Sequence, residues 1–471
     1  MLVASKSIRP ELISLGSVAF LLFAAPRASL KVGSLPLYLI DILLIITLFY
    51  SVLGSRTGPK QGLMSALVIT IASISVVSEF RGGIYLGNLI APLYVTIRTL
   101  LAISLFFSVS RIVRSRKDVK FLLKCVALGM LVTASLMIIS SIPPMRGIAR
   151  AVFSIRYLEP DYMSALVRFG DTDAAIRGRS LVGVSILSGA FINAAWPLAI
   201  LLQQQRSLKS SLKWKGILTT ICLIAPLGVL ASYSRGAILG VLMVVAGAVL
   251  MRSKSMQGSV IAGVIFLGVV VYTVGYKSDL FFFDRLEKRT AAMIQGSYED
   301  KRETERIDAY TAPFIHLSNN PEFSFVGIGT ARNKVGGISA LAGVDGDEAN
   351  HAVFAEAYYS YGLIAALLYM GLIFSALNFL RPRVFADIPV SGYSKNLSQA
   401  LLLSMLALLP WFAFGHAAIS QPRGAMLLFF ILGFVASLPN LERSERLRIK
   451  KIKTLRKNKT DEKNRRHSAL G

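Results

Sequence analysis

The 471-residue chain has few of the residues that build soluble domains or covalent cross-links. Charged residues make up 17% of it, against about 25% in ordinary soluble domains. Its two cysteines, Cys125 and Cys222, both lie inside long apolar runs, which excludes a structural disulfide between exposed loops and a cysteine-based metal site. A soluble protein built around a single core is therefore not expected.

Long apolar runs recur from one end of the chain to the other. A bilayer-crossing helix needs about 20 mostly apolar residues, which predicts an all-α integral membrane protein with about twelve transmembrane helices. The predicted spans lie near 11–26, 34–54, 62–79, 84–108, 119–141, 181–203, 215–232, 234–251, 258–276, 352–379, 397–416 and 424–439. The first could be a signal peptide, but it lacks a clean small-residue cleavage site and another span follows directly, so we interpret it as retained.

Lys and Arg outnumber Asp and Glu by 52 to 26, which gives a formal net charge of +26. This charge could indicate a nucleic-acid partner. The basic residues, however, lie in short loops between apolar runs and in the C-terminal segment 441–471. The positive-inside rule accounts for that pattern with both termini in the cytoplasm, so we expect no nucleic acid. We expect the basic tail to lie against anionic lipid headgroups.

Loop lengths divide the chain into five parts. On the predicted topology two long segments, 142–180 and 277–350, face outward, and the second is too long for a mere connector. The predicted parts are 1–175 with five spans and the first outer loop, 176–276 with spans six to nine, 277–351 as the large outer loop, 352–440 with the last three spans, and 441–471 as the basic tail.

A very short outer turn, Ser232-Tyr233-Ser234-Arg235-Gly236, joins spans seven and eight. Ser232 or Ser234 can cap the start of span eight, so that free backbone amides and the positive helix end lie beside the Arg235 guanidinium. Such an arrangement suits a phosphate or diphosphate. The alternative is that Arg235 extends to lipid headgroups, as many arginines at helix ends do.

His351 stands where the large outer loop meets span ten, and it is one of only four histidines. Helical spacing places Ala355, Tyr358 and Gly362 on its face, which predicts a small-residue groove with a phenol below the imidazole. A neutral imidazole there could act as a general base on a sugar hydroxyl. A histidine that only hydrogen-bonds at the helix end is equally compatible, and no second ligand at metal-binding spacing accompanies it.

Three further features combine charge or glycine with the predicted outer surface. The large loop contains Arg306 and Tyr310, which favour an amphipathic surface helix. Gly327 and Gly329 follow it, and they allow a close backbone approach to a ligand or simply form a turn. Two elements remain, the Arg177-Gly178-Arg179 stretch before span six and the intramembrane charges Arg98 and Asp41. Arg98 must face the interior, a water-filled vestibule or an acidic partner such as Asp41.

The order of these features resembles the bacterial O-antigen ligase and O-antigen polymerase superfamily, which consists of polytopic glycosyltransferases. Ser232 to Gly236 is similar to the family's Ser-x-Ser-Arg-Gly element, and Arg177 to Arg179 is similar to its Arg-Gly element. The large loop with Arg306, Tyr310 and the stretch from Pro321 to Gly329 also matches, as does His351 followed ten residues later by Tyr361-Gly362. The resemblance covers about residues 175–380 and departs at Ala352, where the family usually has Asn.

The resemblance implies a GT-C-like architecture and a cofactor-free, metal-independent, inverting enzyme of the bacterial inner membrane, with its site facing the periplasm. It would transfer glycan from an undecaprenyl-diphosphate-linked oligosaccharide to an acceptor glycan or to lipid A-core, in O-antigen, lipopolysaccharide or exopolysaccharide biosynthesis. Membrane lipids and a chain-length regulator would be its other partners. The implied catalytic residues are His351, Arg235 and Arg306. The implied substrate contacts are Arg177, Arg179, Ser234, Tyr310, Tyr358 and Arg98.

Within the superfamily, polymerisation and ligation onto lipid A-core both remain open. A transporter or flippase of lipid-linked glycan is the alternative from another class, with Arg98 and Asp41 in its pathway. A scaffold that only binds such glycans is a third. The long outer loop that ends at His351 favours the enzyme, since transporters seldom keep so much sequence on one face.

Overall fold

The computed structural model describes most of the helical core and part of the large loop. The described residues are 9–32, 35–53, 62–87, 89–142, 145–153, 178–183, 185–204, 212–232, 234–251, 314–315, 317–329, 352–385, 392–414, 419 and 422–468, with short pieces between 257 and 268.

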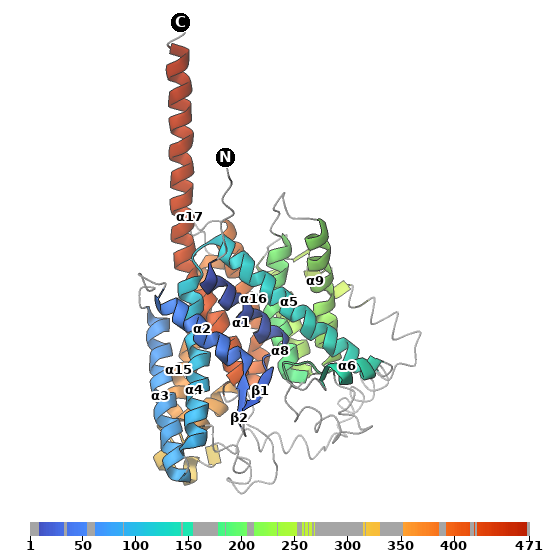
Figure 1. Ribbon diagram of the computed structural model, residues 1–471, viewed down its shortest axis with the longest axis vertical. Coiled ribbons are helices and arrows are strands. Elements are labelled where there is room, and N and C mark those ends of the chain that lie inside the picture. Colours follow the sequence, from blue (N-terminus) through green and yellow to red (C-terminus); the bar gives the residue numbers. More distant parts are fainter. Residues whose placement is uncertain are drawn as a thin grey trace.

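Helices make up almost all of the described chain, and one two-stranded sheet interrupts them (Figure 1). The elements in order are α1 (Pro10–Ala24), β1 (Ser29–Val32), β2 (Leu35–Tyr38), α2 (Leu39–Leu53), α3 (Leu63–Leu86), α4 (Ile90–Ile112), α5 (Arg116–Ser141), α6 (Arg146–Phe153), α8 (Ser185–Gln204), α9 (Leu212–Ala231), α10 (Arg235–Leu250), the 3-10 turn η3 (Pro321–Phe323), α15 (Val353–Phe385), α16 (Gly392–Phe414) and α17 (Pro422–Ser468).

Eight of the described helices are long and apolar enough to cross a bilayer, and α1, α2 and α10 are shorter apolar helices. Eleven of the twelve predicted spans coincide with one of these helices. Most of the ninth, 258–276, lies outside the described residues. The chain is thus a multi-pass, almost entirely α-helical membrane protein.

Two predicted boundaries are wrong. The second span was predicted to begin at residue 34, but 35–38 forms β2, which pairs antiparallel with β1 from Ser29 opposite Tyr38. The third was predicted to end at 79, but α3 continues to Leu86 and ends at Gly87, whose left-handed φ of 64° terminates the helix. The longer α3 therefore includes Glu79 and Arg81.

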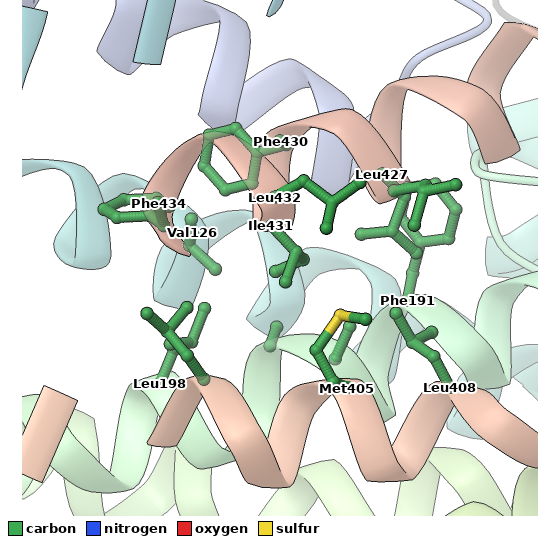
Figure 2. Close-up of a cluster of buried hydrophobic side chains, with 14 of the residues drawn as sticks. Val126, Phe191, Leu198, Met405, Leu408, Leu427, Phe430, Ile431, Leu432 and Phe434 are labelled. Carbon is green, nitrogen blue, oxygen red and sulfur yellow. The ribbon is translucent and has the colours of Figure 1, made fainter. Parts of the chain in front are cut away.

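The core is organised around the first half of α17, which is buried from Ala425 to Leu441 apart from small gaps. It packs along α4 and also touches α1, α15 and α16. Figure 2 shows that apolar side chains from both halves of the chain meet there, namely Val126, Phe191, Leu198, Met405, Leu408, Leu427, Phe430, Ile431, Leu432 and Phe434. Gly433 permits the close approach of α17 to α4, because a Cβ there would lie 2.8 Å from Val109 Cβ.

The bundle has two ends, which can be named by their contacts. At the tail face, Arg9 before α1 donates to Ile112 O at 3.0 Å and pairs with Asp118 at 2.9 Å, and Asn440 of α17 approaches Ser110 O. From there α17 continues as one helix to Ser468, far beyond the other helices (Figure 1). The loop face is the opposite end, where α10, α15 and α17 begin.

Candidate functional site at the loop face

The α9–α10 turn is fixed by its two serines. Ser232 Oγ accepts from Ser234 N at 3.1 Å and donates to Val229 O at 2.5 Å. Ser234 is the N-cap of α10, and its Oγ accepts from Ala237 N at 3.4 Å. The predicted serine cap is therefore confirmed. Both serines are buried, and α10 begins at Arg235, whose side chain lies outside the described residues.

The segment 178–183 lies directly on this turn. Gly178 N donates to Ala231 O at 2.7 Å. A Cβ on Gly178 would lie 2.6 Å from that same oxygen, so the close approach requires glycine. The next residue, Arg179, donates its N–H to Ser140 Oγ of α5 at 2.7 Å. Gly178 is thus hydrogen-bonded to Ala231, the residue that immediately precedes the 232–236 turn, about fifty residues further along the chain.

The start of α17 reaches the same segment through a buried arginine. Arg423 is 8% exposed and donates through Nη1 to Val182 O. A Cβ on Gly183 would lie 2.6 Å from that nitrogen, and Gly183 has φ of 149°, so glycine provides both the space and the backbone conformation. Arg423 was not among the predicted site residues.

The start of α15 is tied to the α16–α17 connection by a buried acid. Glu356 in the first turn of α15 is 2% exposed, and its Oε2 accepts from Ile419 N at 3.0 Å. A carboxylate in the first turn of a helix is favoured by the helix dipole. Ala352, which precedes α15, has φ of 73° and accepts from Glu356 N at 3.0 Å. His351 comes immediately before Ala352 and lies outside the described residues.

The described part of the large loop, 317–329, is packed against α3 and α15. Leu317, Phe323 and Ile328 form a buried cluster with Tyr358 beside it. Arg81 of α3 donates to Val326 O at 2.8 Å, and its guanidinium lies 4.6 Å from the centre of the Phe323 ring. The loop is therefore docked through both apolar and polar contacts.

Glycines of α3 and of the loop segment allow this docking. A Cβ on Gly82 of α3 would overlap the Ile328 carbonyl oxygen, and one on Gly327 would lie 2.6 Å from Tyr361 N. A Cβ on Gly329 would lie 2.5 Å from Glu79 Oε2. The Gly-x-Gly pair, interpreted from the sequence as a ligand approach or a turn, thus approaches the protein's own helices.

The helical face predicted below His351 does not extend to Gly362, because α15 is broken there, with φ of 86° and ψ of 174°. The groove at His351 itself stays a prediction, since that residue lies outside the described residues. Leu363 N donates to Ser324 O at 2.8 Å and Gly329 N donates to Ser360 O at 2.7 Å, so the loop replaces the interrupted helical bonds. Tyr358 lies in the part before the break. Its ring centroid is 5.3 Å from that of Phe314 and 6.3 Å from that of Phe354.

Arg98 and Asp41 form the ion pair anticipated between them, with Arg98 Nε 2.9 Å from Asp41 Oδ2. The remaining predicted residues Arg177, Arg306, Tyr310 and His351 lie outside the described residues, and their roles stay predictions. Within the described part of the chain, no three His, Cys, Asp or Glu side chains gather in a way that could hold a metal ion.

Sequence reasoning missed the buried charges Glu79, Glu356 and Arg423 and the partly buried Arg81. A signal existed for each, because a charge inside an apolar run is costly unless it is paired or functional. Glu79 ended the predicted third span, and Arg81 fell just beyond it. Arg423 follows Pro422 and precedes Gly424, which resembles an ordinary helix start.

The fold is that of a multi-pass membrane protein in which α10, α15 and α17 begin at the same end of the bundle. No protein-family model matches this chain, and no curated protein matches it.

Proposed function

We propose that this protein is a membrane glycosyltransferase that transfers an undecaprenyl-diphosphate-linked glycan to a saccharide hydroxyl at the loop face. The observation that carries the proposal is the 2.7 Å hydrogen bond from Gly178 to Ala231, which brings the 177–179 stretch to the residue that precedes the 232–236 turn. The Glu356–Ile419 and Arg423–Val182 contacts extend this connection to the starts of α15 and α17. They support a single site rather than scattered loop charges.

In the proposed reaction the acceptor hydroxyl oxygen attacks the anomeric carbon of the donor. The bond from that carbon to the diphosphate oxygen breaks, and the lipid diphosphate leaves with the bonding electrons. His351 takes the proton of the hydroxyl as general base. Arg235 and Arg306 are proposed to stabilise the charge that develops on the leaving diphosphate, and the capped amides of α10 add to the positive potential at the same place. Inner-membrane location with the loop face in the periplasm belongs to this proposal.

The test uses purified protein in nanodiscs with undecaprenyl-diphosphate oligosaccharide and EDTA, and it follows both glycan length and lipid diphosphate release. We expect lengthening that Arg235→Ala and His351→Ala abolish. Arg383→Ala is the matched control, because Arg383 pairs with Glu442 at 3.0 Å at the tail face, remote from the site. Full activity of either site variant would contradict the proposal. Diphosphate release only on addition of lipid A-core would assign ligation instead of polymerisation.

One observation favours a second candidate, a flippase of lipid-linked glycan. The helix break at Gly362 lies close to two buried carboxyl groups. Glu79 lies against Gly329, whose N–H donates to Ser360 O, and Glu356 lies in the first turn of the same helix. Interrupted helices beside intramembrane acids are typical of transporters. Movement of lipid-linked glycan across protein-containing vesicles, without change in glycan length, would support this candidate over the enzyme.

A further inference from the structure

The ion pair between α4 and α2 leaves polar atoms of both side chains unused. Arg98 donates through Nε alone to Asp41 Oδ2, at 2.9 Å. A guanidinium and a carboxylate can share two parallel hydrogen bonds, but this pair uses one nitrogen and one oxygen. Among the described residues, Asp41 Oδ1 is enclosed and has no hydrogen-bond partner. A buried acceptor left this way is destabilising, and more so when it is charged.

Two tyrosine rings hold the guanidinium in place. Its carbon lies 3.9 Å from the ring centre of Tyr38 and 5.7 Å from that of Tyr94. Tyr38 ends β2, and Tyr94 lies one turn before Arg98 on α4. The β1–β2 hairpin therefore fixes the orientation of the guanidinium, so its terminal nitrogens are preorganised before any ligand arrives.

The pair is mostly buried, with each side chain 11% exposed, and it lies beside residues that face lipid. Leu93 and Ile97 of α4 are about half exposed, and so are Leu37 and Leu39 on either side of Tyr38. Large apolar side chains exposed on a membrane bundle face acyl chains. The one hydrogen bond from Arg98 to Asp41 uses Nε and leaves the two terminal nitrogens for a ligand. Arg98 lies eight residues from Ile90, where α4 begins at the loop-face end, which suits the headgroup side of the hydrocarbon layer.

We propose that Arg98 and Asp41 bind the headgroup of a lipid whose phosphate carries a nearby hydrogen-bond donor. The phosphate accepts from the terminal nitrogens of Arg98, and an N–H or O–H of the same headgroup donates to Asp41 Oδ1. The last torsion of aspartate is soft, so a rotation of the carboxylate presents Oδ1 to the ligand. Ethanolamine and glycerol phospholipids have this chemistry, and so does a glycosyl diphosphate lipid. The lipid chain lies along Leu93 and Ile97.

Native mass spectrometry of the full-length protein with added lipids tests this site. Phosphatidylcholine is the matched control lipid, because its phosphate is the same but its trimethylated nitrogen donates no hydrogen bond. We expect wild-type protein to retain phosphatidylethanolamine and phosphatidylglycerol on the order of tenfold better than phosphatidylcholine, the factor that about 1.4 kcal/mol provides. Asp41→Ala removes this preference, and Arg98→Gln weakens retention of all three lipids. Arg383→Gln, in the tail-face ion pair, changes neither the lipid preference nor the overall lipid retention.

Removing one partner of a partly buried ion pair can unfold a protein, whereas replacing both with apolar residues is often neutral. The double variant Asp41→Leu/Arg98→Met therefore provides the second test, with the same expected loss of preference. Equal retention of the three lipids by wild type, or an unchanged preference in the double variant, would overturn the inference. Competition with undecaprenyl-diphosphate glycan identifies the lipid. If the glycan lipid displaces bound phospholipid, the site is assigned to the glycan lipid. If bound phospholipid is retained, the site is assigned to a phospholipid. The inference does not depend on the proposed function.

Discussion

Substitution of Gly82 by alanine tests whether the loop segment 317–329 is docked on α3 as described. The added Cβ would overlap the Ile328 carbonyl oxygen and lie 2.8 Å from its carbon. Both atoms belong to the backbone, so no side-chain rotation relieves the overlap and the loop has to retreat. Gly371 of α15 is the matched control, because a Cβ there meets nothing within 4 Å.

The magnitude follows from what the retreat breaks. Overpacking costs about 1–3 kcal/mol, and the hydrogen bonds from Arg81 to Val326 O and from Gly329 to Ser360 O each contribute about 1 kcal/mol. We therefore expect Gly82→Ala to weaken docking by about 3 kcal/mol, which raises the undocked population roughly 100-fold. Alanine is up to about 1 kcal/mol better than glycine in a helix, so Gly371→Ala is neutral or stabilising.

Limited proteolysis in nanodiscs measures the undocked population, with the rate of cleavage within 277–351 as the readout. When opening is fast relative to cleavage, this rate follows the open fraction. We expect much faster cleavage for Gly82→Ala than for wild type, and no acceleration for Gly371→Ala. Equal cleavage rates in the two variants would show that the loop does not rest on α3 at Ile328.

Three more substitutions test the loop-face geometry. Ala352→Gly removes the strain of a left-handed alanine, about 1–2 kcal/mol. Glycine also gives the unfolded chain more conformational freedom, so we expect the free energy of unfolding to rise by only about 0.5–1 kcal/mol in an SDS titration. A fall would refute the left-handed conformation of Ala352. Ser234→Ala removes the N-cap of α10 and costs about 1 kcal/mol, comparable to Ser115→Ala at the cap of α5 by the same titration. Glu356→Ala leaves Ile419 N without its acceptor and costs about 1–3 kcal/mol, whereas Glu356→Gln retains an acceptor oxygen and most of the stability; equal losses would contradict the assigned contact.

The sequence was sufficient for the features that depend on local pattern. Apolar run length located eleven helices, and the two serines of the 232–236 turn offered the cap of α10, which is Ser234. The β1–β2 hairpin was missed because Leu35, Leu37 and Tyr38 are apolar and merge with the run that forms α2. The four residues from Leu35 to Tyr38 are too few for the period-two pattern of a strand to be distinguished from the start of a helix.

Contacts between distant segments were beyond prediction for a different reason. The break of α15 at Gly362 depends on the backbone of 324–329 being present to replace its hydrogen bonds. Glycine alone does not predict a break, since glycine is common in membrane helices. The buried position of Arg423 likewise depends on the missing Cβ of Gly183, some 240 residues earlier.

The continuous helix α17 carries the basic tail away from the bundle, which determines how salt acts on it. From Leu441, its last buried residue, to Ser468 the helix extends about 40 Å at 1.5 Å per residue. Attraction to charged headgroups falls off within a Debye length, about 8 Å at physiological ionic strength. Only the first turns beyond Leu441 lie within that distance of the bundle, and the placement of the tail against headgroups stays a prediction. Lys and Arg outnumber Asp and Glu in the rest of the helix, and like charges four residues apart destabilise a helix. Added salt should consequently strengthen the end of this helix, the reverse of its effect on a lipid-bound tail.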